Sequence, residues 1–136
     1  MRRLPPLAAL VVVVVLAGCG GGSSSTPYSA AGTKACLVKN GFTGVTTEAK
    51  KVGFIAAFAA NGGIQARSPQ GNVLTIAFTD SPDSVPGIEK AYRKAAPPRL
   101  RPHMSDIMES QRNAVLVWTV SPSQTELTTA ENCLAS

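Results

Sequence analysis

Ten consecutive residues, Leu7 to Leu16, carry no polar side chain, and they follow a positively charged start at Met1-Arg2-Arg3. An α-helix rises about 1.5 Å per residue, so ten residues reach only half of a hydrocarbon core of roughly 30 Å. A short apolar run behind a charged start predicts a secretory signal peptide rather than a membrane span. The alternative, a buried core helix, is disfavoured because five consecutive valines start a helix poorly and Pro5-Pro6 precede them. The folded domain must therefore come from the residues that follow.

The apolar run ends at Leu16-Ala17-Gly18-Cys19. These four residues resemble the lipobox of bacterial lipoproteins, in which a small residue precedes a cysteine at the end of the run. The resemblance implies cleavage before Cys19, a diacylglyceryl thioether on Cys19 and a further acyl group, such as palmitate, on the new amino terminus. Two or three acyl chains anchor a protein stably, whereas one does so only marginally. The resemblance thus implies a lipid-anchored protein on the extracytoplasmic side of the cell membrane or outer membrane.

The residues after Cys19 are Gly, Ser, Thr and Pro up to residue 27, and they offer no side chains for a core. Such a composition predicts a flexible tether. We expect three parts: a cleaved signal peptide over residues 1–18, a lipid-anchored tether over residues 19–28, and one globular domain over residues 29–136.

Two cysteines remain, Cys36 and Cys133, one near each end of that domain. The compartment beyond the cytoplasmic membrane permits disulfides. A bridge between them would close a loop of about 97 residues, for which chain entropy gives at most roughly 4.7 kcal/mol. The alternative is a pair of buried free thiols. Neither a redox site nor a zinc knuckle is predicted, because no Cys-x-x-Cys is present.

The apolar periodicity and the turn residues predict a small α+β domain. Residue spacing places Val52, Ile55, Phe58 and Ala59 on one inner stripe of a helix, although Phe54-Ile55-Ala56 could instead be extended. Ser123 and Glu126 have the spacing of a capping box. The expected elements are a helix over 33–40, a helix from Thr46 or Thr47 to Ala59, strands over 64–67 and 73–78, a helix over 85–96, a helical turn around Met104–Met108, a strand over 114–120 and a final helix from Ser121 or Ser123.

The predicted order is therefore α-α-β-β-α-β-α. A hairpin followed by a helical crossover implies a sheet of about three strands, mixed or antiparallel, with helices packed on it. The Cys36–Cys133 disulfide would join the first and last helices.

Catalytic and metal-binding patterns are weak. His103 is the only histidine, and Ser105 and Asp106 lie too close to it in sequence for a typical triad. His103, Met104 and Met108 have donor atoms that suit Cu(I), but a spacing of four between methionines is also what a core-facing helix produces. We therefore predict no catalytic residue, no metal site and no cofactor.

Positive charge is concentrated between residues 90 and 101. Five cations lie there without an acid, namely Lys90, Arg93, Lys94, Arg99 and Arg101. With Arg2 and Arg3 removed, eleven Lys and Arg face eight Asp and Glu, so the mature chain carries only +3. The cluster is either a solvated helix face or a docking site for an anionic surface. Nucleic acid is not expected, because the protein faces away from the cytoplasm and aromatic residues do not interleave with the cations.

These observations favour a lipid-anchored envelope lipoprotein with a small, non-enzymatic binding or interaction domain. Its expected partners are the membrane, through the anchor, and an envelope protein or an anionic surface. The alternatives are an envelope hydrolase or transferase that uses His103, and a domain that docks on an anionic surface through Lys90–Arg101.

Overall fold

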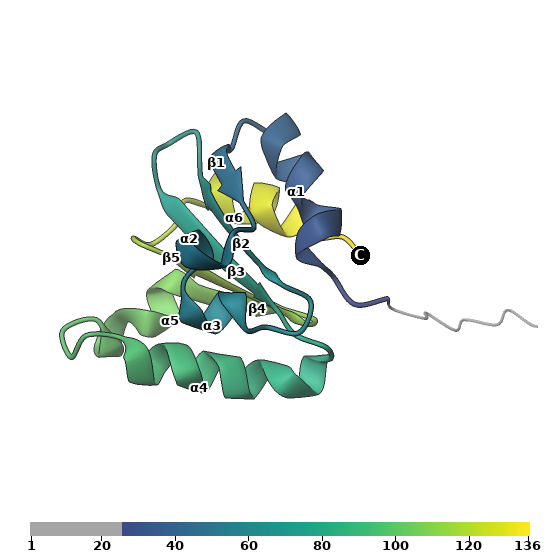
Figure 1. Ribbon diagram of the computed structural model, residues 1–136. Helices are drawn as coiled ribbons and strands as arrows, with labels where there is room; N and C mark the ends of the chain where they lie inside the picture. The colour runs from purple at the N-terminus through teal and green to yellow at the C-terminus, as the bar shows by residue number, and fades with distance from the viewer. Residues whose placement is uncertain (1–25) are drawn as a thin grey trace, which may run out of the picture.

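A computed structural model describes residues 26–136 of the chain (Figure 1). The predicted signal peptide, the lipobox with Cys19 and most of the predicted tether lie outside the described residues. Within residues 26–136 the helices are α1 (Ala30–Lys39), α2 (Ala49–Val52), α3 (Phe54–Ala57), α4 (Val85–Ala95), α5 (Met104–Ile107) and α6 (Gln124–Asn132). The strands are β1 (Thr43–Thr46), β2 (Gly63–Arg67), β3 (Val73–Phe78), β4 (Met108–Gln111) and β5 (Ala114–Trp118), and short 3₁₀ turns precede α4 and α5.

The strands form one sheet in the order β1-β2-β3-β5-β4, and each neighbouring pair is antiparallel. The α+β class is confirmed. The predicted hairpin is also confirmed, with Ile64 of β2 opposite Ile76 of β3. Its loop closes where the Ser68 N–H donates to the Asn72 carbonyl at 2.8 Å. Gly71 in this loop has φ of +91°, a conformation that glycine adopts without a steric cost.

The prediction of three strands is wrong, because two short edge strands complete the sheet. β1 pairs only with β2, through an irregular register, and β4 pairs only with β5. The exposed residues are Thr43 and Gly44 in β1 and Glu109 and Ser110 in β4, so neither strand shows a clear apolar alternation. Their ladder hydrogen bonds come from one neighbour each, and they form because β2 and β5 offer a free edge. The predicted helical turn holds over Met104–Ile107, whereas Met108 already belongs to β4.

The single helix predicted from Thr46 or Thr47 to Ala59 is also wrong. Two one-turn helices, α2 and α3, occupy this segment, and Gly53 between them has φ of +83°. A residue in the left-handed region cannot continue a right-handed helix, so the helical phase changes at Gly53. As a result Phe58, predicted on the buried stripe, is 77% exposed. The extended alternative for residues 54–56 is wrong as well, since α3 is helical.

The ends of the longer helices follow the sequence signals more closely. α1 begins three residues before the predicted Thr33, because Ser29 caps it by accepting from the Gly32 N–H at 3.0 Å. It ends before Gly41, which has φ of +86°, and the following Phe42 is buried. α4 ends shortly before Pro97, also as predicted.

The predicted capping box at the start of α6 is confirmed. The Glu126 N–H donates to Ser123 Oγ at 3.2 Å, and the Ser123 N–H donates to Glu126 Oε2 at 2.8 Å.

The two faces of the sheet pack against different helices, with α1 and α6 on one side and α3 and α4 on the other (Figure 1). The larger core joins the first pair of helices to alternating strand residues: Leu37, Ile64, Leu74, Ile76, Phe78, Leu116, Trp118 and Ala130. On the other face, Ala77 packs with Val52 and Ala56. A Cβ on Gly63 would lie 2.7 Å from the Cβ of Ala56, so glycine there allows α3 to approach the sheet closely.

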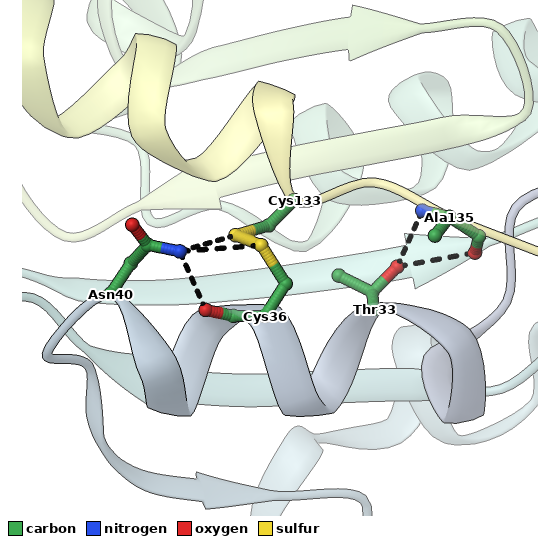
Figure 2. Close-up of a disulfide and its surroundings, with 5 residues drawn as sticks. All are labelled: Thr33, Cys36, Asn40, Cys133 and Ala135. Carbon is green, nitrogen blue, oxygen red and sulfur yellow. Dashed lines mark hydrogen bonds between the residues drawn. A yellow bond between two sulfur atoms is a disulfide. The ribbon is translucent and has the colours of Figure 1, made fainter.

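The predicted disulfide between Cys36 and Cys133 is present, with the two Cα atoms 5.2 Å apart (Figure 2). Cys36 lies in α1 and Cys133 follows the last residue of α6, so the bridge ties the first helix to the last. The Asn40 side chain donates to the Cys36 carbonyl at 2.9 Å and reaches both sulfur atoms. Beside the bridge, Thr33 Oγ1 accepts from the Ala135 N–H at 3.1 Å. The C-terminal segment is thereby fixed to α1.

The first described residues are held against the β4–β5 turn. The buried Asn113 side chain accepts from the Tyr28 N–H at 2.8 Å and donates to the Tyr28 carbonyl at 2.9 Å. Arg112 stacks over the Tyr28 ring, 4.2 Å from its centroid, and donates to the Thr26 carbonyl at 2.9 Å. Thr26, the first described residue, is therefore fixed beside this turn.

Candidate functional site

An apolar pocket of about 470 Å³ lies beside the C-terminal half of α4. Five separate segments line it. They are the α2–α3 junction around Gly53, the C-terminal part of α4 with Tyr92 and the exposed Ala95, the loop that follows α4, helix α5, and the end of β5 with Trp118. The volume falls within the range of roughly 300–1,000 Å³ that is typical of small-molecule sites.

The break at Gly53 shapes one wall of the pocket. Because the chain turns there, Val52 points inward and is buried, while Phe54 points outward and is 78% exposed. Leu100, on the loop after α4, lines the same pocket and is 43% exposed. We place the mouth of the pocket beside Phe54 and Leu100, the two large apolar residues of the lining that are exposed.

The lining carries no charged side chain. The lining residues with a polar side-chain group are Tyr92, Trp118 and Thr119. Thr119 is engaged, since its hydroxyl donates to Asn72 Oδ1 at 2.9 Å. By contrast, the Tyr92 hydroxyl and the Trp118 N–H are buried and have no hydrogen-bond partner within residues 26–136. An unpaired buried polar group costs about 1–3 kcal/mol of stability, so both groups are hydrogen-bond donors without a partner among mostly apolar residues.

Burial raises the pKa of Tyr92 to about 12. The hydroxyl therefore keeps its proton at neutral pH and can donate a hydrogen bond. Trp118 is 1% exposed and is the only tryptophan in the chain, so it is a natural reporter for this pocket.

The five predicted basic residues are all exposed near the pocket. Lys90, Arg93 and Lys94 belong to α4. Lys94 directly precedes the lining residue Ala95, and Arg99 directly precedes Leu100.

Arg101 has a structural role instead. Its Nε donates to the Ala96 carbonyl at 3.0 Å, which satisfies a backbone group at the end of α4. The two ion pairs found within residues 26–136 are Lys51–Glu48 and His103–Asp106, so the other four cations of this cluster have no acidic partner there.

His103 is not among the lining residues, although it directly precedes Met104, which is. Its Nδ1 is 3.5 Å from Asp106 Oδ2, and both side chains are more than half exposed. Met104 and Met108 are buried in the core, so the methionine spacing reflects core packing. In the described part of the chain, no three His, Cys, Asp or Glu side chains gather in a way that could hold a metal ion.

The scattered carboxylates have local roles. The Ser84 hydroxyl donates to Asp80, and this bond holds the pKa of Asp80 below its ordinary value. Burial by itself would raise the pKa of Glu126, but hydrogen bonds from Ser68, Ser123 and Asn72 outweigh it and hold that pKa below its ordinary value. Glu126 is thus a buried structural carboxylate.

Sequence reasoning missed the pocket. No spacing in the sequence brings together residues 52–55, 92–107 and 117–119. The one available signal was Gly53, which weakens a helix and here separates two.

No protein-family model, no curated protein and no solved structure matches the chain. Among residues 26–136, none of the helices combines the length and apolar character needed to cross a membrane. The candidate site therefore rests on its own geometry.

Proposed function

We propose that the protein is a lipid-anchored lipoprotein of the bacterial envelope whose domain binds an apolar chain. The anchor would be attached at Cys19 after cleavage between Gly18 and Cys19. The lipobox residues Leu16-Ala17-Gly18-Cys19 behind a short apolar run support this assignment. The Cys36–Cys133 bridge is in keeping with it, because disulfides persist in oxidising compartments.

The observation that carries the binding function is the pocket beside α4. It is large enough for a small molecule and lined almost entirely by apolar side chains. Each methylene group moved from water into such a site contributes about 0.8 kcal/mol. The Tyr92 hydroxyl and the Trp118 N–H are buried and unpaired and belong to lining residues, so a side-chain shift that brings either into the pocket would offer a donor to a ligand with a hydrogen-bond acceptor at one end. A fatty-acyl chain with its carboxyl or ester group combines both features.

We propose a binding rather than a catalytic role for this domain. The pocket lining has no acid, base or thiol, and His103, with only the exposed Asp106 beside it, does not contribute to the pocket. Acyl transfer or hydrolysis would need a nucleophile and a base within hydrogen-bond reach of each other. The alternative enzymatic role through His103 has no comparable support.

Trp118 fluorescence tests this function directly. The chain from residue 19 with Cys19→Ser, secreted into an oxidising compartment, would be titrated with laurate and palmitate below their micelle concentrations. We expect a saturable change in Trp118 emission with a stoichiometry of one. The Ala95→Phe variant, which places a ring in the pocket, should bind at least tenfold more weakly, because it occupies the space of several methylene groups.

The matched control is Ala35→Phe, an exposed alanine of α1 outside the pocket lining. It should bind as the parent chain does. No saturable change in emission, or equal binding by the Ala95→Phe and parent chains, would contradict the proposed function.

A further inference from the structure

We propose that the mouth of the pocket docks on an anionic lipid bilayer. The docking face consists of the exposed side chains Phe54, Phe58, Lys94, Arg99 and Leu100. This inference extends the proposed function, on which it rests, because it makes the bilayer the source or destination of the bound chain.

The apolar part of the docking face is a pair of phenylalanines on α3. Phe54 and Phe58 are 78% and 77% exposed, and their ring centroids lie 4.7 Å apart. The opposite side of α3 is fixed, since Ala56 is fully buried and lies against Gly63. The helix therefore holds both rings outward as a pair. Large apolar patches on a protein surface mark sites of contact with a protein or a membrane.

The charged part of the docking face comes from α4 and the loop that follows it. Lys94 and Arg99 adjoin the lining residues Ala95 and Leu100, and neither forms an ion pair within the described residues. Lys90 and Arg93 on α4 extend the same positive charge. Each basic residue near an anionic bilayer strengthens binding by about fivefold. Aromatic rings beside unpaired cations are the combination that suits an interface of acyl chains and anionic headgroups.

The length of the tether favours the bilayer as the occupant. Seven residue steps separate Cys19 from Thr26, and their extended reach of about 25 Å is comparable with the domain diameter of roughly 30 Å. The anchor thus keeps the domain within reach of the headgroups whichever face turns toward them. Docking is then effectively intramolecular, so a weak contact of two rings and a few cations is sufficient.

Vesicle sedimentation of the Cys19→Ser chain tests the docking face without the anchor. The probes are vesicles of phosphatidylcholine alone and of phosphatidylcholine with phosphatidylglycerol, at low and high ionic strength. We expect binding to the mixed vesicles that weakens with salt. Lys94→Glu with Arg99→Glu should weaken it by at least about 30-fold, since two contributions of about fivefold are lost. Phe54→Ser with Phe58→Ser should weaken it by at least about tenfold, since both rings leave the interface.

Matched controls come from α1 on the opposite side of the sheet. Val38→Ser removes an apolar side chain that is 55% exposed, and Lys34→Glu with Lys39→Glu reverses two exposed cations. Both should bind mixed vesicles within about threefold of the parent chain. The inference is overturned if the parent chain does not bind mixed vesicles, if the docking-face variants bind as the parent does, or if the α1 controls lose as much affinity.

The two proposals fail in distinguishable ways. The chain with Phe58→Ser, Lys94→Glu and Arg99→Glu keeps every residue of the pocket lining, so it should still show the Trp118 response to laurate while it binds mixed vesicles at least about 30-fold more weakly. That result supports the docking face. A normal Trp118 response in a chain that never binds mixed vesicles overturns the docking face alone. If the variants affect vesicle binding as predicted but no chain shows a Trp118 response, the docking face is supported. The proposal that the pocket binds a fatty-acyl chain is then contradicted.

Discussion

Removal of the Cys36–Cys133 disulfide should cost the domain a large share of its stability. The bridge spans 97 residues, and the chain-entropy relation gives about 4.7 kcal/mol for such a loop at 25 °C. The separation of 5.2 Å between the two Cα atoms falls within the usual range for disulfides, so little of this contribution is expected to be lost to a distorted backbone. Small domains have total stabilities of about 5–15 kcal/mol, and the bridge is therefore comparable with the lower end of that range.

Urea unfolding followed by Trp118 fluorescence measures the loss. Because Trp118 is 1% exposed in the folded domain, its emission should change strongly on unfolding. In the Cys19→Ser chain, Cys36→Ala with Cys133→Ala should lower the free energy of unfolding by about 4–5 kcal/mol. A loss below about 1 kcal/mol, or two titratable thiols in the unfolded parent chain, would refute the reasoning.

Three further predictions follow from local geometry. Gly53→Ala should destabilise the domain by about 1–2 kcal/mol, because φ is +83° there. Gly87→Ala in α4 should instead stabilise it by up to about 1 kcal/mol, because a Cβ at residue 87 meets nothing within 4 Å. Equal effects of the two variants on the free energy of unfolding in urea would contradict this contrast. Asn113→Ala should lower the free energy of unfolding by about 2–3 kcal/mol, because it removes three side-chain hydrogen bonds to the backbone of Tyr28 and Thr79. A loss below about 0.5 kcal/mol would contradict a stabilising role for these bonds. Glu126→Gln should cost about 1–2 kcal/mol at pH 7. The folded pKa of Glu126 is below its ordinary value of 4.5. Its contribution to stability is therefore complete above pH 4.5 and is lost as the pH falls through the folded pKa. In urea unfolding at a series of pH values, the free energy of unfolding should fall less steeply toward low pH in the variant than in the parent chain, and parallel curves of this free energy against pH would contradict the prediction.

The elements that the sequence predicted well are those whose signals are local. In the hairpin of β2 and β3, β3 is rich in β-branched residues and the loop consists of turn residues. The bounds of both strands agree with the prediction within one residue. Ser123 and Glu126 mark the start of α6 through bonds that span only three residues. The disulfide was predictable for another reason, because only two cysteines remained once Cys19 was assigned to the anchor.

The elements that the sequence did not predict depend on distant neighbours. β1 and β4 are edge strands whose hydrogen bonds come from β2 and β5, so their own residues carry little signal. The pocket requires five segments from residue 52 to residue 119 to meet, and no local pattern encodes such a meeting. Phe58 was placed on the wrong side because periodicity was extended through Gly53, where the backbone changes direction.

The intact mass of the protein extracted from bacterial membranes tests the central claim, that a lipid at Cys19 carries the domain. The account predicts a chain that begins at Cys19 and carries a diacylglyceryl group, whereas the Cys19→Ala variant should remain unmodified and fail to partition with the membrane. A membrane-bound protein that retains Met1, or one whose Cys19 is unmodified or bonded to another cysteine, would contradict the account.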